Sequence, residues 1–192
     1  MATDIRLKEG LAEITASLVS TYVECGKISH LGHAALPSRS AIIDILADLF
    51  DLLYPGFGRR QNLHLGNVEY FAGDLVDGLH DKLIQQIAAA LRHELCQEAP
   101  HVDFEALAQQ KAIGLLQKLP ELRPILEQDV EFAFAGDPAA KSYHEIIFCY
   151  PGLEAITTYR LAHELLKLGV PIIHTKRGLG YQLAPPGEGD SV

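Results

Sequence analysis

Two histidine–glutamate pairs, His163–Glu164 and His93–Glu94, are the residues whose types most directly suggest metal chemistry. A zinc-protease site needs a second histidine four residues after the first, so that both imidazole rings reach one ion. That position holds Lys167 in the first case and Gln97 in the second. Both pairs are therefore interpreted as polar residues of amphipathic helices.

A second arrangement, His30 and His33, could share a metal ion in principle, but no third ligand lies near them in the sequence. They are interpreted as loop histidines, and no metal site is predicted. The sequence also lacks the GxSxG turn of a nucleophilic serine and the GxxxxGK and GxGxxG loops that hold phosphates. No residue of this chain is predicted to be catalytic.

Asp137 is the most informative polar residue, because it stands in a turn, Gly136–Pro138, directly before a proline that requires an extended backbone. Two interpretations remain open. Its carboxylate can cap the helix that follows by accepting backbone N–H groups. It can also bind the cationic amine of a small substrate. Tyr159 and Arg160 are interpreted as helix-packing or ion-pair residues in preference to a binding role.

Composition restricts the class of protein. The chain has 192 residues, 48% of them hydrophobic, enough for a packed core in one domain or in one domain plus extensions. Its net charge of −9 argues against a nucleic-acid or anionic-membrane partner, since both require a cationic face. No apolar run approaches the roughly 20 residues of a membrane span, and the N-terminus lacks the apolar core of a signal peptide. The expected location is the cytoplasm.

The three cysteines are Cys25, Cys96 and Cys149. Their odd number and wide spacing give no CxxC chemistry, and all three lie in apolar or helical stretches. They are predicted to be reduced, buried thiols.

The elements that would position these residues are helices. Apolar residues recur every three or four positions through most of the chain, and no convincing strand appears before the tail. Pro120 and Pro124 predict a bend, while Gly169 and Pro171 predict a helix stop. Asp44, Asp48 and Asp51 are placed on the polar side of their helix.

The predicted fold is all-α, a bundle of about six to eight helices with a short irregular or hairpin tail. The helical stretches are 3–25, 38–53, 67–97, 103–116, 125–135 and a segment after 137 that breaks at Pro151–Gly152 and resumes to Leu168.

Four consecutive motifs resemble the helical amino-terminal domain of the serine O-acetyltransferase family in order and spacing. They are Asp137–Tyr143 (DPAAKSY), Cys149–Ala155 (CYPGLEA), Tyr159–Leu165 (YRLAHEL) and Leu168–Pro171 (LGVP). The resemblance is dense from Gly136 to Ile173. Leu36–Ser40 and the helix after it also resemble the longer bacterial members. The predicted domains are 1–173, the helical domain, and 174–192, a divergent and partly disordered tail.

This resemblance implies a step of cysteine biosynthesis in which an acetyl group passes from acetyl-CoA to the hydroxyl of L-serine. It implies that the acidic residue of the DPA motif, Asp137, pairs with the ammonium of serine. It also implies that the helical domain contributes to oligomer assembly. In the family, the histidine base, its aspartate partner and the acetyl-CoA groove lie on a following β-helix of hexapeptide repeats.

The tail departs from that family, because His174–Val192 shows no hexapeptide pattern. A truncated form without acetyl transfer, and with weak or no serine binding in isolation, is therefore the first hypothesis. The second is a non-catalytic helical module that pairs with itself or with a full-length serine acetyltransferase. His174–Leu183 resembles the last β-hairpin of winged-helix response regulators, which gives DNA binding as a third hypothesis that the net charge disfavours. Residues from Pro185 onward are predicted to be disordered.

Overall fold

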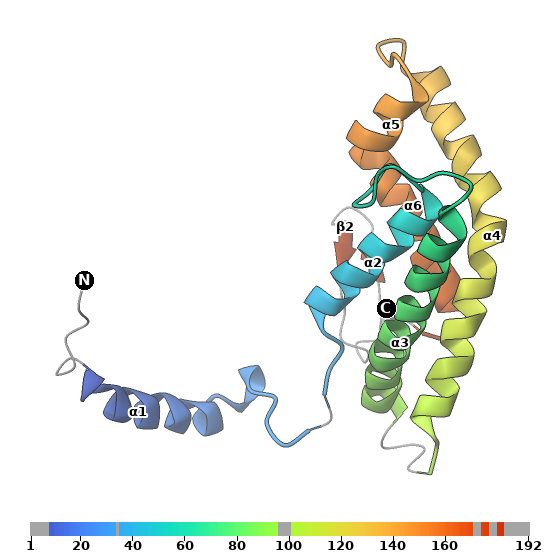
Figure 1. Ribbon diagram of the computed structural model, residues 1–192. Coiled ribbons are helices and arrows are strands. Elements are labelled where there is room, and N and C mark those ends of the chain that lie inside the picture. The colour runs from blue at the N-terminus through green and yellow to red at the C-terminus, as the bar shows by residue number, and fades with distance from the viewer. Residues whose placement is uncertain (1–7, 34, 96–100, 171–173, 177–179, 183–192) are drawn as a thin grey trace. The chain divides into compact units, whose positions relative to one another are not determined.

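The computed structural model describes residues 8–33, 35–95, 101–170, 174–176 and 180–182. Helices dominate these residues, which confirms the predicted all-α fold (Figure 1). The chain divides into two compact units, Met1–Ala34 and Ala35–Val192. The first unit holds α1 (Leu11–Glu24) and the short 3₁₀ helix η2 (Gly26–Ile28). The second holds α2 (Arg39–Leu53), α3 (Val68–Leu95), α4 (Phe104–Gly136), α5 (Tyr143–Cys149), α6 (Pro151–Lys167), β1 (His174–Lys176) and β2 (Gly180–Gln182).

The core of the second unit forms where α3 and α4 run antiparallel, with α2 against α3 and α6 against α4 (Figure 1). Each helix contributes a buried stripe at intervals of three or four residues, the spacing that keeps side chains on one helix face. On α3 and α4 the stripes include Leu79, Leu83 and Ile87, and Ala108, Ala112, Leu115, Leu119, Leu122 and Leu126. On α3 the buried stripe is the apolar face that the sequence spacing predicts.

Helix ends follow local sequence signals. Ser38 and Asp103 cap α2 and α4 by accepting hydrogen bonds from the backbone N–H groups of Ala41 and Ala106. At the end of α6, Gly169 adopts φ +72°, and Val170 donates its backbone N–H to the carbonyl oxygen of Leu165. The predicted stop at Gly169 is confirmed.

The predicted bend at Pro120 and Pro124 is wrong, because α4 continues through both prolines to Gly136. Each proline removes one N–H donor and costs about 3 kcal/mol inside a helix. Buried leucines flank both positions, at 119, 122 and 126, on the face that packs into the core. Packing of that face offsets the local cost, so the helix persists where the local rule predicts an interruption.

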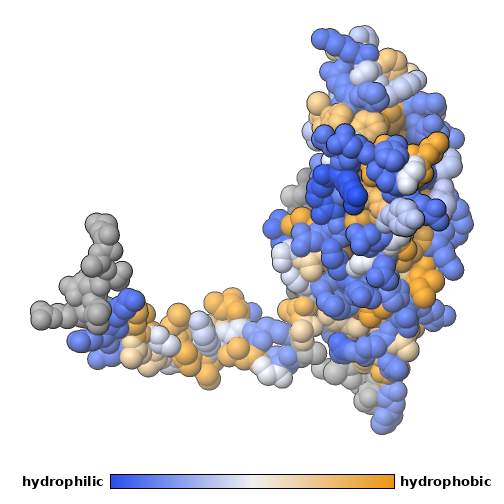
Figure 2. Space-filling model, in the orientation of Figure 1, coloured by the Kyte–Doolittle hydropathy of each residue, from blue (hydrophilic) through white to orange (hydrophobic). Residues whose placement is uncertain are grey.

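Helix α1 starts at Leu11, later than the predicted residue 3, and residues 1–7 lie outside the described part. The helix has no buried residue. Apolar side chains gather along it (Figure 2), and Leu11, Ile14, Leu18 and Val23 are 51–80% exposed. Such a stripe on a helix of the first unit is a surface for contact with another apolar surface.

The tail is predicted to be irregular or a hairpin, and its described residues form two paired strands. Strands β1 and β2 pair antiparallel, with Thr175 opposite Tyr181. Residues from Pro185 onward, where disorder is predicted, lie outside the described part. None of the helices described here is both long and apolar enough to cross a lipid bilayer.

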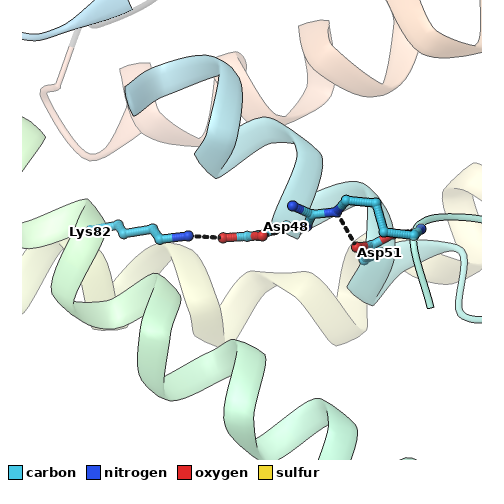
Figure 3. A network of polar contacts seen from close by, with 4 residues as sticks. Asp48, Asp51 and Lys82 are labelled. Carbon is cyan, nitrogen blue, oxygen red and sulfur yellow. Dashed lines mark hydrogen bonds and ion pairs between the residues drawn. The ribbon is translucent and has the colours of Figure 1, made fainter. Parts of the chain in front are cut away.

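Asp48 and Asp51 are placed by the sequence on the polar side of their helix, but in the fold their side chains are only 5% and 7% exposed. They form a network of polar contacts, part of which is shown in Figure 3. Asp48 accepts hydrogen bonds from Lys82 Nζ on α3, at 2.6 Å, and from the guanidinium of Arg59. Asp51 accepts from Arg59 Nε at 2.8 Å and from the Arg59 backbone N–H at 3.0 Å. Burial opposes the charge of Asp48, but the Lys82 and Arg59 bonds outweigh it, and its pKa is lowered. The network ties α2 to α3 and to the loop that follows α2.

A Gly58→Ala substitution is expected to lower the free energy of unfolding by about 1–3 kcal/mol, because the new methyl group overpacks this network. A Cβ at Gly58 would lie 1.7 Å from Asp51 Oδ1, the oxygen that binds the Arg59 backbone. Urea denaturation followed by circular dichroism measures the change. The control is Gly73→Ala on α3, where a Cβ meets nothing within 4 Å. The free energy of unfolding of that variant is expected to rise by about 0.5–1 kcal/mol. Equal changes in the free energy of unfolding of the two variants would contradict the packing shown.

Candidate functional site

The turn between α4 and α5 holds Asp137 in a defined position. Asp137 is the first residue after α4, with φ −115° and ψ 102°, the extended backbone that Pro138 requires. Its carbonyl oxygen accepts from the Ala140 N–H at 3.1 Å, closing a turn, and its side-chain Oδ1 accepts from the Ala139 N–H at 2.9 Å. The carboxylate is thus fixed by its own turn.

Asp137 does not cap α5, which was one of the two predicted roles. Ser142 is the N-cap of that helix, and its hydroxyl oxygen accepts from the Glu145 N–H at 3.1 Å. Glu145 in turn accepts from the Lys141 N–H at 2.8 Å. Because these two residues satisfy the start of α5, the Asp137 carboxylate remains at the turn and keeps acceptor capacity for another partner.

Tyr150 is the second residue of the site. It lies between α5 and α6, and its hydroxyl donates to Asp137 Oδ2 at 2.5 Å. Its backbone is extended, φ −90° and ψ 108°, as Pro151 at the first position of α6 requires. The sequence interpretation gave Tyr150 no role. Its place before a proline at a helix junction was a signal for a fixed backbone, but its partner thirteen residues upstream is visible only in the fold.

The charge state of the pair follows from this contact. The Tyr150 hydroxyl, and next the Ala139 N–H, lower the pKa of Asp137, because both stabilise the carboxylate. The same bond raises the pKa of Tyr150 to about 12. At neutral pH Asp137 is therefore ionised and Tyr150 protonated, so the site presents a negative charge that suits a cationic ligand.

Apolar packing sets the frame around this pair. Val130 on α4, Ile146 on α5 and Leu153 on α6 form a small buried cluster against which Tyr150 packs. The loop after α2 closes on α5, where the Phe57 ring lies 5.2 Å from that of Phe148, centroid to centroid. The Asp48–Asp51–Arg59 network anchors the same loop, so the site depends on three helices and one pinned loop.

Arg160 and Tyr159 lie where the sequence interpretation placed them. Arg160 on α6 donates from Nε and from Nη2 to the two carboxylate oxygens of Asp129 on α4, both at 2.7 Å. This forked pair raises the pKa of Arg160 and holds α6 on α4. Tyr159 stacks on His163, with ring centroids 5.9 Å apart.

The other predicted residues do not join the site. The rings of His30 and His33 lie 5.0 Å apart in the first unit. Glu164 pairs with Lys167 at 2.8 Å, and His93 and Glu94 lie near the end of α3. Among the residues that the structure describes, no three histidine, cysteine, aspartate or glutamate side chains gather as metal ligands.

The prediction of buried thiols is wrong for Cys25 and Cys149, both of which are exposed. Cys25 ends α1, a helix without any buried residue, and Cys149 ends α5 on its solvent side. Cys96 lies outside the described residues.

Comparisons with known proteins agree with the motif resemblance. No protein-family model matches the chain. A plasmid-encoded serine acetyltransferase of Synechococcus elongatus is 38% identical over 142 residues, which are 72% of this chain and 44% of that protein. A serine acetyltransferase of Bacillus subtilis is 49% identical over 43 residues, 22% of this chain and 20% of that protein. The chain thus spans less than half the length of these relatives.

Solved structures give the same result for the fold. Serine acetyltransferase 1 of Entamoeba histolytica in complex with L-cysteine matches with a TM-score of 0.53 and 30% identity, covering 65% of this chain and 41% of that one. Serine acetyltransferase isoform 3 of the same organism, in complex with cysteine, matches with a TM-score of 0.51 and 22% identity, covering 79% of this chain and 49% of that one. This match supports the fold alone. The regular secondary structure of the described residues is helical apart from the short strand pair β1–β2, and these residues contain no β-helix. Over its helical region, this chain is homologous to the helical N-terminal region of the serine acetyltransferases.

Proposed function

We propose that this chain is the helical, serine-binding part of a serine O-acetyltransferase, in which Asp137 pairs with the ammonium group of L-serine. The observation that carries the proposal is the ionised carboxylate held at the α4–α5 turn by Tyr150 and Ala139. The homology supports it, because the motif resemblance implies this role for the aspartate of the DPA sequence. The functional unit in this proposal is 1–173, with 174–192 as a separate tail.

The chemical step needs a base within hydrogen-bond reach of the serine hydroxyl. The side-chain partner of Asp137 among the described residues is Tyr150, which stays protonated at neutral pH. A histidine–carboxylate pair of the described part, His80 and Asp81, lies on α3 and not at the α4–α5 turn. We therefore propose that the base and the acetyl-CoA site belong to a β-helix that these residues do not contain. The helical unit then contributes the amino-group contact alone.

The 192-residue polypeptide is expected to release no CoA from acetyl-CoA and L-serine above the rate without protein. A thiol-trapping assay at saturating concentrations of both substrates measures this release. The Asp137→Ala variant is the matched control, and the two proteins are expected to give the same baseline. Turnover by the parent chain that disappears in Asp137→Ala would overturn the proposal that the base and the acetyl-CoA site lie outside these residues.

A second candidate function is favoured by the apolar stripe of α1, which is exposed along its length. In this alternative the chain is a non-catalytic interaction module that pairs through helix faces with another copy or with a full-length serine acetyltransferase. Covering apolar surface of this kind removes it from water and lowers the free energy. A single monomeric species in sedimentation at high concentration, together with no binding to a full-length enzyme, would exclude this alternative.

A further inference from the structure

We propose that Tyr150 is a positioning residue that fixes the orientation of the Asp137 carboxylate. In this orientation the carboxylate selects a ligand group that carries only hydrogen-bond donors, namely an ammonium group. The proposal rests on the function proposed above for Asp137 and extends it to a second residue. It concerns a contact within this chain, so it can be tested without substrate.

Both oxygens of the carboxylate are held, and by different donors. Oδ1 accepts from the Ala139 backbone N–H at 2.9 Å, and Oδ2 accepts from the Tyr150 hydroxyl at 2.5 Å. Anchors on two oxygens stop rotation of the carboxylate plane as well as of the side chain. An ionised carboxylate has about four lone-pair positions, so about two remain open. These can receive N–H donors, and the group has no proton to offer an acceptor.

Tyr150 is itself fixed, which is why it can orient another side chain. Its backbone N–H donates to the Ile146 carbonyl oxygen at 3.2 Å, and its own carbonyl oxygen accepts from the Leu153 N–H at 3.0 Å. Its ring packs on the cluster of Val130, Ile146 and Leu153. Pro151 holds its backbone extended. The break between α5 and α6 therefore places the hydroxyl at the end of α4.

The phenol also contributes an acceptor. Its proton is committed to Asp137, because the bond to that carboxylate raises the pKa of Tyr150 to about 12. The phenol oxygen keeps lone pairs beside the open positions of the carboxylate. An ammonium group can therefore donate to Asp137 and to Tyr150 together. Glu145 and Cys149 are the other titratable groups that influence Tyr150.

The Tyr150→Phe variant tests this role, because it removes the hydroxyl and keeps the ring that packs. We expect the pKa of the Asp137 carboxyl, followed by ¹³C NMR titration, to rise toward its ordinary value. The Ala139 amide resonance should shift as well. Tyr143→Phe on α5 is the control. The Tyr143 ring lies 4.8 Å from that of Phe134, centroid to centroid, whereas the tyrosine hydroxyl that donates to Asp137 is that of Tyr150. That variant should leave the Asp137 titration unchanged.

An equal Asp137 pKa in the parent chain and in Tyr150→Phe would overturn the proposal. If Tyr150→Phe does not fold, the same coupling is tested in the parent chain, by following the Tyr150 Cζ resonance through the titration of Asp137. The Tyr150 Cζ resonance must then move with the midpoint of Asp137, and a Cζ shift that stays constant through that midpoint overturns the proposal. Serine is absent from these titrations, so their outcome is separate from the function of Asp137. A coupled pair combined with no role of Asp137 in serine use would remove only the proposed function.

Discussion

Replacing Leu115 with alanine is expected to lower the free energy of unfolding by about 3 kcal/mol, within the 2–5 kcal/mol typical of buried leucines. Leu115 is 0% exposed and belongs to the main core cluster with Leu83 and Ile87 of α3 and Leu161 of α6. Its loss removes apolar contact and leaves a cavity that the surrounding helices can fill only in part. Urea denaturation followed by circular dichroism measures the change.

The control is Ile113→Ala, two residues away on the same helix. Ile113 is 41% exposed, so its truncation is expected to change the free energy of unfolding by less than about 1 kcal/mol. A loss below 1 kcal/mol for Leu115→Ala would mean that α3 and α4 do not form the core described here. Equal losses for the two variants would lead to the same conclusion.

The helix that sequence spacing predicted best is α3, whose apolar stripe is continuous. The fold buries Leu79, Leu83 and Ile87 of that stripe. The two prolines of α4 show the limit of a local rule. A proline weakens a helix by an amount set by its own backbone, whereas the leucines beside it gain from contacts made by other helices. The sequence alone does not show those contacts.

Asp48 and Asp51 show a second limit. On a helical projection they belong to the polar side of α2, which is usually the solvated one. Their cationic partners, Arg59 and Lys82, come from a loop and from another helix. Burial of a carboxylate depends on such partners, so it cannot be predicted before the fold brings them together.

Asp137 was identified from its turn and from the motif resemblance, while Tyr150 was not. The turn depends on neighbours in sequence, including Pro138, and is therefore visible locally. The hydroxyl that holds the carboxylate reaches it across the α5–α6 junction. The part of the site that depends on adjacent residues was thus predictable, and the part that depends on how two helices meet required the structure.

Asp137→Asn is expected to lower kcat/KM for L-serine by roughly 100-fold in an active chimera, because a charge-assisted bond to the ammonium is lost. The chimera carries residues 35–170 of this chain in place of the matching segment of the Synechococcus elongatus serine acetyltransferase. Asparagine keeps the size of the side chain and an oxygen for the Ala139 N–H, so the turn is expected to persist. The substitution removes the charge and, because an amide NH2 replaces Oδ2, also the hydrogen bond that the Tyr150 hydroxyl donates.

The matched control is Glu131→Gln, which neutralises an exposed carboxylate on α4 just before the turn. It is expected to leave kcat/KM for L-serine and for acetyl-CoA within about twofold of the parent chimera.

The steady-state value of kcat/KM for L-serine in the Asp137→Asn chimera, relative to its parent, is the most direct measurement of whether this carboxylate binds the substrate ammonium. We predict a loss of roughly 100-fold for L-serine with the KM for acetyl-CoA nearly unchanged. An active parent chimera whose use of L-serine is the same with aspartate or asparagine at position 137 would contradict the assignment of this site.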